Sequence, residues 1–179
     1  MYYSTTDELE KFYLKIKLIP CPFCHLIGTL IKHGSWKGFL GYVGLFGIRG
    51  YRIFCNNRKR SKGCGKTFSL IPSSIIKGFA IPSSQLWIFL KQKHKSKNII
   101  QAGHHLKNTF SISTIYRLWN LFSLAQSKIR NFIIKITSPP AMNFTTDPAL
   151  QTIAHLESAF NGSICPVADF QCKFQVDFL

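Results

Sequence analysis

The apolar residues of this chain change their spacing partway along it, in the stretch between Pro72 and Pro82. Before that stretch the apolar runs are short, and residues 50–54 and 67–69 have the composition of two neighbouring strands. From residue 84 onward the apolar side chains recur every three or four positions, which is the spacing of one helix face. The sequence therefore predicts an α+β chain, with a small antiparallel β unit followed by helices.

Two helices are predicted at the start of the second part. The first covers about residues 84–93, where Leu86 and Phe89 are among the residues of its apolar surface. The second covers about residues 97–106. Ser96 is expected to cap it, because a serine hydroxyl can accept a hydrogen bond from a free backbone amide.

A third and longer helix carries the clearest periodic pattern. Ser111 is expected to be its N-cap, and the helix is predicted to continue as far as Thr137, before Ser138-Pro139-Pro140. Six apolar residues fall within an arc of about 100° on its helical wheel: Ile112, Ile115, Trp119, Phe122, Ile129 and Ile133. The opposite face carries polar and basic residues: Ser113, Arg117, Asn120, Ser127, Lys128, Asn131 and Lys135.

Two short helices are predicted near the end of the chain. Asp147 followed by Pro148 is typical of a helix start, and Asn161-Gly162 is expected to end that helix. A second helix covers about residues 166–175. This acidic tail is expected to pack on the rest of the chain, with a homodimer contact as the alternative.

The charges are distributed very unevenly. No Asp or Glu lies between Lys11 and Thr146, whereas 22 of the 23 Lys and Arg residues lie in that window. A body that is cationic throughout repels itself, and a polyanion relieves that repulsion. The pattern favours nucleic acid as the partner, with an acidic membrane or protein surface as the alternative. The same window has none of the carboxylates that most enzyme chemistry uses, so we expect a protein that is not an enzyme.

No membrane span is predicted. The longest apolar run, residues 39–48, is ten residues long and interrupted by glycines, whereas a spanning helix needs about 20 apolar residues. The first ten residues are polar and acidic, unlike a signal peptide. We expect a cytoplasmic protein, associated with the nucleoid if the chain is bacterial.

Four of the six cysteines are spaced as metal ligands. Cys21 and Cys24 are separated by two residues, which lets both thiolates point into one tetrahedral site. Cys55 and Cys64 are separated by eight residues, whereas about two to four usually separate the members of a zinc-ligand pair. The glycines flanking Cys64 nevertheless permit a tight turn. The two predicted strands would present this second pair opposite the first. We expect a structural Zn²⁺ on all four cysteines, because four thiolates leave no position for water.

Other interpretations of the cysteines stay open. The four thiols could be unligated and buried as small apolar groups, or they could form disulfides, which an intracellular setting disfavours. His25 and His33 could replace a cysteine ligand but are expected at the surface. Cys165 and Cys172 are expected to be half-buried thiols on a helix, with a second metal site that includes His155 as the alternative.

Residues 110–119, Phe-Ser-Ile-Ser-Thr-Ile-Tyr-Arg-Leu-Trp, resemble the recognition helix of bacterial helix-turn-helix domains. The resemblance implies that the helix start and polar face contact duplex DNA through Ser113, Thr114, Arg117 and Asn120. Arg117 would pair with guanine or clamp a phosphate, and Lys107 in the preceding turn would contact a phosphate. The alternative is an ordinary amphipathic helix in a three-helix bundle.

The cysteine pairs, the residues 64–69 and this helix together resemble the N-terminal part of bacterial insertion-sequence transposases, over about residues 19–137. Small stand-alone bacterial proteins are similar. The resemblance implies a zinc ribbon and a helix-turn-helix that recognise DNA, the ribbon supplying phosphate contacts from Arg58, Lys59, Arg60, Lys62 and Lys66. Only four acids follow from residue 147, so the carboxylates of a transposase catalytic domain, which hold two metal ions, are not expected.

The expected organisation has four parts: a segment 1–18, a zinc ribbon 19–73, a helix-turn-helix domain 74–137 and a helical tail 138–179. The expected function is sequence-directed binding of double-stranded DNA without catalysis. Two alternatives are a structural zinc protein of RNA or the ribosome and a small transcriptional regulator. A nuclease using Asp147, Glu157 or a histidine is a further, disfavoured alternative.

Overall fold

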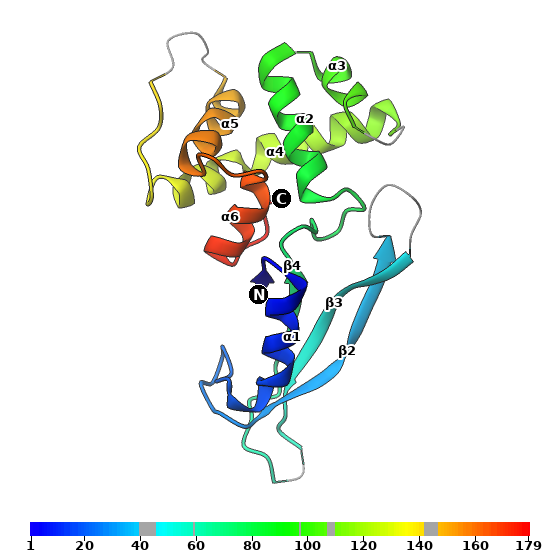
Figure 1. Cartoon of the computed structure of the whole chain (residues 1–179), viewed down its shortest axis with the longest axis vertical. Coiled ribbons are helices and arrows are strands. Elements are labelled where there is room, and N and C mark those ends of the chain that lie inside the picture. The colour runs from blue at the N-terminus through cyan, green and yellow to red at the C-terminus, as the bar shows by residue number, and fades with distance from the viewer. Residues whose placement is uncertain (40–45, 59, 97, 107–109, 142–146) are drawn as a thin grey trace.

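A computed structural model of the chain describes residues 1–179 except 40–45, 59, 97, 107–109 and 142–146. The described residues form a four-stranded mixed sheet and six α-helices, which confirms the predicted α+β class. Figure 1 shows that the sheet and the first helix occupy one end of an elongated molecule and that most of the other helices occupy the opposite end.

The sheet has the strand order β1-β4-β3-β2. Its strands are β1 (Tyr2–Tyr3), β2 (Leu30–Phe39), β3 (Phe46–Cys55) and β4 (Thr67–Pro72). β2 and β3 pair antiparallel along their whole length, from Leu30 opposite Cys55 to Phe39 opposite Phe46. β4 is antiparallel to β3 but pairs only with its second half, and β1 is parallel to β4. The predicted strands at 50–54 and 67–69 therefore lie within β3 and β4.

The helices are α1 (Thr6–Leu14), α2 (Ser83–Ser96), α3 (Ile99–His104), α4 (Ile112–Ile133), α5 (Pro148–Ala159) and α6 (Pro166–Phe174). Two of the predicted N-caps are confirmed. Ser111 accepts a hydrogen bond from the backbone amide of Thr114 at 3.3 Å, and the carboxylate of Asp147 accepts one from Ala149 at 2.9 Å. These side chains satisfy backbone donors that the first helical turn leaves without intrahelical partners.

Three details of the helix predictions are wrong. Asn98, not Ser96, caps α3, because its side-chain oxygen accepts hydrogen bonds from two backbone amides of the first turn. The hydroxyl of Ser96 instead donates to the carbonyl of Gln92 at the end of α2. α4 ends at Ile133 rather than Thr137. Ile112, which the spacing assigns to the apolar face of this helix, is 58% exposed.

Two apolar cores hold these elements. The larger one joins α2, α3, α4, α5 and α6, with fully buried side chains such as Phe89, Phe122 and Phe170. The helices of the tail are thus part of the same core as α2 to α4. The smaller core joins α1 to the sheet through residues such as Leu9, Leu30 and Leu70.

The end of the chain connects the two cores. The buried side-chain amide of Gln171 on α6 donates to the carbonyls of Ser73 and Ile75, just after β4. The hydroxyl of Tyr2 on β1 donates to Asp177 at 2.5 Å. Figure 1 shows both chain termini in this middle region, between most of the sheet and most of the helices.

Candidate metal centre and cationic surfaces

Four cysteine sulfurs converge where the segment before β2 meets the loop between β3 and β4. The Sγ atoms of Cys21, Cys24, Cys55 and Cys64 all lie within 4.8 Å of one another. The Cys21–Cys64 sulfurs are 3.8 Å apart and the Cys24–Cys55 sulfurs 3.6 Å apart. A tetrahedral ion with metal–sulfur distances of about 2.3 Å requires sulfurs about 3.8 Å apart. The predicted residues are therefore brought together, and the cluster could hold a metal ion.

The turn after Cys21 is shaped around its sulfur. The backbone amide of Phe23 donates to Cys21 Sγ at 3.4 Å, and the amide of His25 donates to the carbonyl of Cys21 at 2.9 Å. His25 closes this turn with a φ of 60°. Amides that point at a sulfur stabilise its thiolate form, which is the form that binds a metal.

The second pair is held by a loop in which glycine is required. A Cβ atom on Gly63 would lie 2.2 Å from the carbonyl oxygen of Asn56 and 2.8 Å from Cys55 Sγ. Gly65 has a φ of 73°, a conformation that side chains other than glycine rarely adopt. The backbone amide of Cys64 donates to Cys55 Sγ at 3.2 Å. The eight intervening residues form a loop that returns Cys64 beside Cys55, so the wide spacing does not separate the two sulfurs.

The four thiols do not have equivalent surroundings. Burial raises the pKa of the Cys21 thiol. Burial would raise that of Cys55 too, but hydrogen bonds from the Thr29 hydroxyl, at 3.2 Å, and from the Cys64 amide outweigh it and lower the pKa of Cys55. Thr29 was not predicted from the sequence, because no cysteine motif includes a residue 26 positions from its partner.

The other candidate ligands lie elsewhere. His25 and His33 are exposed and do not belong to the cluster. Cys165 and Cys172 are half-buried at the start of α6 and within it, as expected. In the part of the chain that the structure describes, no second group of three or more potential ligands occurs. His155 is buried, with its Nε2 atom 2.9 Å from the carbonyl of Thr137.

The predicted phosphate contacts of the β unit lie in the loop between Cys55 and β4. The described basic side chains of the loop between β3 and β4 are all exposed: Arg58, Arg60, Lys62 and Lys66. Lys66 lies over the ring of Phe23, 5.1 Å from its centre, within the turn of the first cysteine pair. Lys59 and Lys107 lie outside the described residues. The loop that holds Cys64 in the candidate metal centre is therefore cationic.

The predicted contacts on α4 form a second group. Ser113, Arg117 and Asn120 are exposed on one side of the helix. Thr114 is half-buried, and its hydroxyl lies 2.9 Å from that of Ser111, so it supports the N-cap. The guanidinium group of Arg117 lies 5.7 Å from the ring centre of Phe79, which holds it at the surface near the start of α4.

The two cationic groups are at opposite ends of the molecule. Figure 1 shows the loop between β3 and β4 at the lower end and α4 in the upper part, with β2 and β3 running between them. The structure thus does not gather all predicted contacts into one patch. The exposed cations of the two long strands, Lys32, Lys37 and Arg52, lie along the path between the two groups.

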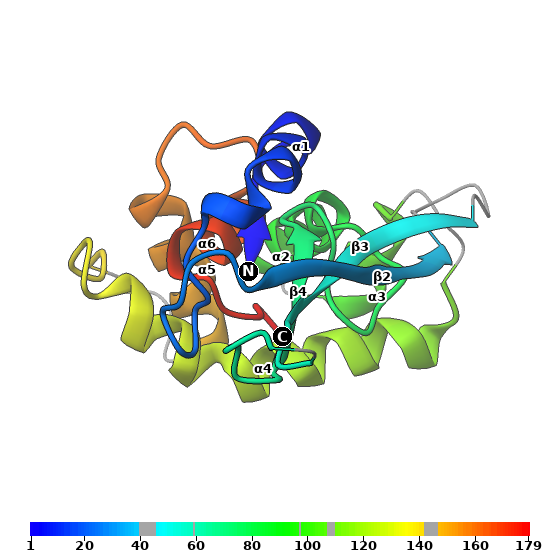
Figure 2. The same ribbon diagram turned by 90° about the horizontal axis from the view of Figure 1, so that it is seen from below.

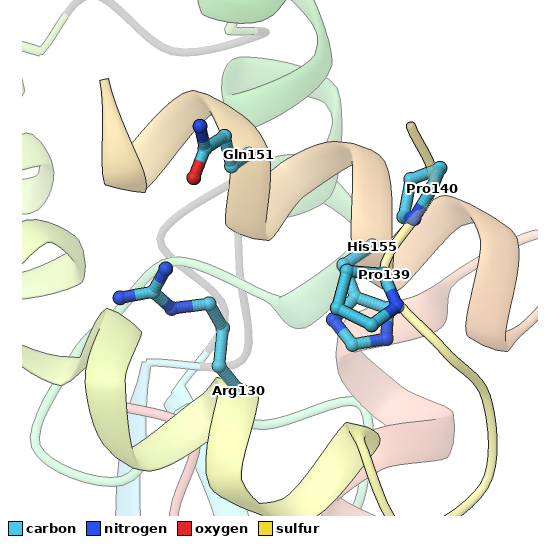
Figure 3. A pocket seen from close by; sticks show the side chains of 5 residues that line it. All are labelled: Arg130, Pro139, Pro140, Gln151 and His155. Atoms are coloured by element: carbon cyan, nitrogen blue, oxygen red, sulfur yellow. The ribbon is translucent and has the colours of Figure 1, made fainter. Parts of the chain in front are cut away.

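A pocket of about 220 Å³ lies between α4 and α5 (Figure 3). Its lining is formed by Arg130, Pro139, Pro140, Gln151 and His155. None of these residues carries a carboxylate. Of the acids considered for a nuclease, Asp147 serves as the N-cap of α5 and Glu157 is exposed on the same helix. The pocket and these acids do not form a site of paired carboxylates.

Comparison with family models, with curated proteins and with solved structures yields no match to this chain. None of the described helices is both long enough and apolar enough to cross a membrane.

Proposed function

We propose that this chain is a duplex-DNA-binding protein without catalytic activity, and that its four cysteines hold a structural Zn²⁺. The observation that supports the proposal most directly is the cluster of four sulfurs at tetrahedral distances, held in part by a loop of exposed cations. The cluster has four thiolate ligands and no carboxylate, a donor set that suits zinc.

The zinc stabilises the fold of the sheet and α1. Cys21 and Cys55 are buried members of the smaller core, which contains eight buried residues among those described. A core of that size is marginal, and an ion that fixes two loops adds the stability that burial alone does not supply. The four thiolates fill the coordination sphere, so no position remains for a reacting water.

α3 and α4 act as the helix-turn-helix. The two helices approach closely, since a Cβ atom on Gly103 of α3 would lie 2.3 Å from Cδ1 of Ile115 on α4. Ser113, Arg117 and Asn120 are exposed on α4 and face the major groove, and Arg117 reads a base or holds a phosphate. The resemblance to the N-terminal part of insertion-sequence transposases supports the same assignment, and the chain then corresponds to the targeting part of such an enzyme.

The zinc assignment is tested by the metal content of the purified protein and of the variants Cys24→Ser and Cys64→Ser. One zinc per chain is expected, lost in both variants together with the fold of the sheet. A protein with no zinc, or a Cys24→Ser variant that keeps its zinc and its fold, would contradict the assignment. Cys172→Ser is the matched control and should retain one zinc.

DNA binding is tested by fluorescence anisotropy with a duplex of mixed sequence at several salt concentrations. If eight cations neutralise phosphates, the logarithm of the affinity should fall with the logarithm of salt at a slope of about −7. Arg117→Ala should weaken the preference among sequences selected from a random library. Lys173→Ala, which removes an exposed cation of the tail, should not. Tighter binding of a structured RNA than of duplex DNA in competition would favour an RNA-associated function instead.

A further inference from the structure

The outer half of the β2–β3 hairpin extends beyond the rest of the sheet. Pairing of β3 with β4 begins at Tyr51, opposite Leu70, whereas pairing with β2 continues to Phe46, opposite Phe39. Residues 36–39 and 46–50 thus form a two-stranded extension beyond the part of the hairpin that β4 pairs with, here called the ribbon arm. Figures 1 and 2 both show the arm reaching the side of the molecule where α3 and the start of α4 lie.

The outermost described residues of the ribbon arm expose a pair of aromatic rings. Phe39 is 52% exposed and Phe46 is 64% exposed, and their ring centres are 5.8 Å apart at an interplanar angle of 86°. Ile48, next on the same face of β3, is 45% exposed. Large apolar side chains that cluster at the surface usually mark a contact with another molecule.

The ribbon arm is fixed to the segment that connects β4 to α2. The buried guanidinium group of Arg49 donates to the carbonyl of Ile76 at 3.1 Å and to that of Phe79, and it lies over the ring of Trp36. Phe79 is also the residue whose ring lies beside Arg117 of α4. These contacts hold the arm in a defined position relative to the proposed DNA-reading helix, so both can contact one ligand.

The charge and shape of the hairpin indicate which ligand that is. Neither strand contains an acidic residue, and Lys32, Lys37 and Arg52 are exposed along them. β2 is an edge strand, but the register shifts after Lys32 and after Trp36, together with its lysines, disfavour pairing with the edge of a second copy. A cationic two-stranded ribbon that exposes a pair of aromatic rings is complementary to a groove of duplex DNA.

We propose that the ribbon arm enters a groove of the same duplex that α4 contacts, that Phe39 and Phe46 wedge against a base step, and that the protein thereby bends DNA. This inference rests on the proposed duplex-DNA function. A ten-residue strand is about 33 Å long, close to one turn of B-DNA. The hairpin is therefore long enough for one duplex to contact the cationic loop between β3 and β4 near one end of the hairpin and α4 near the other.

The experiment is ligase-catalysed circularisation of a duplex of about 100 base pairs and mixed sequence. Such a fragment is shorter than the persistence length of about 150 base pairs and closes slowly unless a protein bends it. The native protein should increase circle formation several-fold. The double variant F39A/F46A should reduce circle formation to the level without protein. Its affinity in anisotropy should fall by about tenfold and its salt slope should stay unchanged, because base contacts are lost and phosphate contacts are kept.

The matched control is Ile164→Ala, which removes a side chain that is 94% exposed in the turn before α6. It should circularise DNA as well as the native protein. If the native protein binds duplex DNA but F39A/F46A forms as many circles, the inference is wrong and the proposed function stands. If the native protein does not bind duplex DNA at all, the proposed function fails first. If F39A/F46A instead abolishes a dimer seen by sedimentation without DNA, the aromatic pair is a self-association surface and the inference is overturned.

Discussion

At the scale of single residues, the cysteine ligands could be predicted from the sequence, but the groups that tune them could not. The Cys-x-x-Cys spacing and the glycines around Cys64 indicate where sulfurs and tight turns occur. The hydroxyl of Thr29 reaches Cys55 only because β2 and β3 pair at their ends, with Leu30 opposite Cys55. That register is a property of the folded sheet and leaves no local sequence signal.

Thr29 provides a test of this arrangement. Thr29→Val keeps the volume and shape of the side chain but removes the hydroxyl hydrogen bond to Cys55 Sγ. Zinc affinity should fall by about tenfold, since groups that hydrogen-bond to a metal ligand typically contribute about 10- to 100-fold. Competition with a chromophoric chelator measures the affinity. Thr67→Val, at the exposed start of β4, should leave it unchanged, and equal affinities for all three proteins would contradict the role of Thr29.

The pKa of Asp177 predicts how the stability of the fold depends on pH. Burial would raise the pKa of this carboxyl, but hydrogen bonds from Tyr2 and Lys77 outweigh it and lower the pKa below the ordinary value of about 4. A carboxyl with a lower pKa in the folded state stabilises the fold above its unfolded pKa. That contribution is lost as the pH falls through the folded value.

The variant Asp177→Asn should therefore be less stable than the native protein at neutral pH, by about 1 kcal/mol because Asp177 and Lys77 are partly exposed. The difference should shrink as the pH falls below about 4. Urea denaturation between pH 7 and pH 3 measures it. Glu157→Gln, at an exposed acid, is the control. If the loss of unfolding free energy in Asp177→Asn is the same at every pH in this range, the carboxyl charge is not responsible.

At the scale of elements, helices with a side-chain cap could be predicted, whereas the glycine-rich strand β2 could not. Ser111 and Asp147 bind backbone amides next to them in sequence, so their signal is local. β2 contains Gly34 and Gly38 and exposes most of its central residues, so it has neither the alternation nor the composition of a typical strand. It forms because β3 provides a partner along its whole length.

The corrected cap of α3 leads to a prediction at this scale. Asn98→Ala removes an acceptor for the amides of Ile100 and Gln101 and should lower the free energy of unfolding by about 1 kcal/mol. Ser96→Ala should cost less, because the Ser96 hydroxyl bonds to the carbonyls of Gln92 and Asn98 and to the amide of Asn98, and not to the amides of the first turn of α3. Urea denaturation of both variants compares them. A larger loss for Ser96→Ala would restore the cap expected from the sequence.

At the scale of the whole molecule, the sequence does not indicate how the parts join. The tail has the signals of two helices, but their burial with α2 and α4 in one core depends on contacts such as Phe122 with Phe178 and Phe132 with Phe170. The first 18 residues likewise have no motif, yet Leu9 and Phe12 of α1 belong to the smaller core. Long-range packing of this kind has no local pattern for a single sequence to display.

The unequal cores predict how the molecule responds to loss of the proposed zinc. Twenty described residues are buried in the larger core, which contains none of the four clustered cysteines. The smaller core includes Cys21 and Cys55, so removal of the ion leaves thiols and loops at its centre with no ligand to fix them. Chelation should therefore unfold the sheet and α1 first and leave α2 to α6 folded.

Hydrogen exchange read by mass spectrometry measures this, before and after chelation of the metal. Backbone amides of β2, β3 and β4 should lose most of their protection, while those of α4 and α5 should keep theirs. The side chains of Gln171 and Asp177 join the sheet and α1 to the helices α2 to α6. Amides of the segment just after β4 should therefore show intermediate protection. Uniform loss across all helices would mean that one cooperative unit spans both cores. No loss in the sheet would mean that the thiol cluster does not need an ion to stay together.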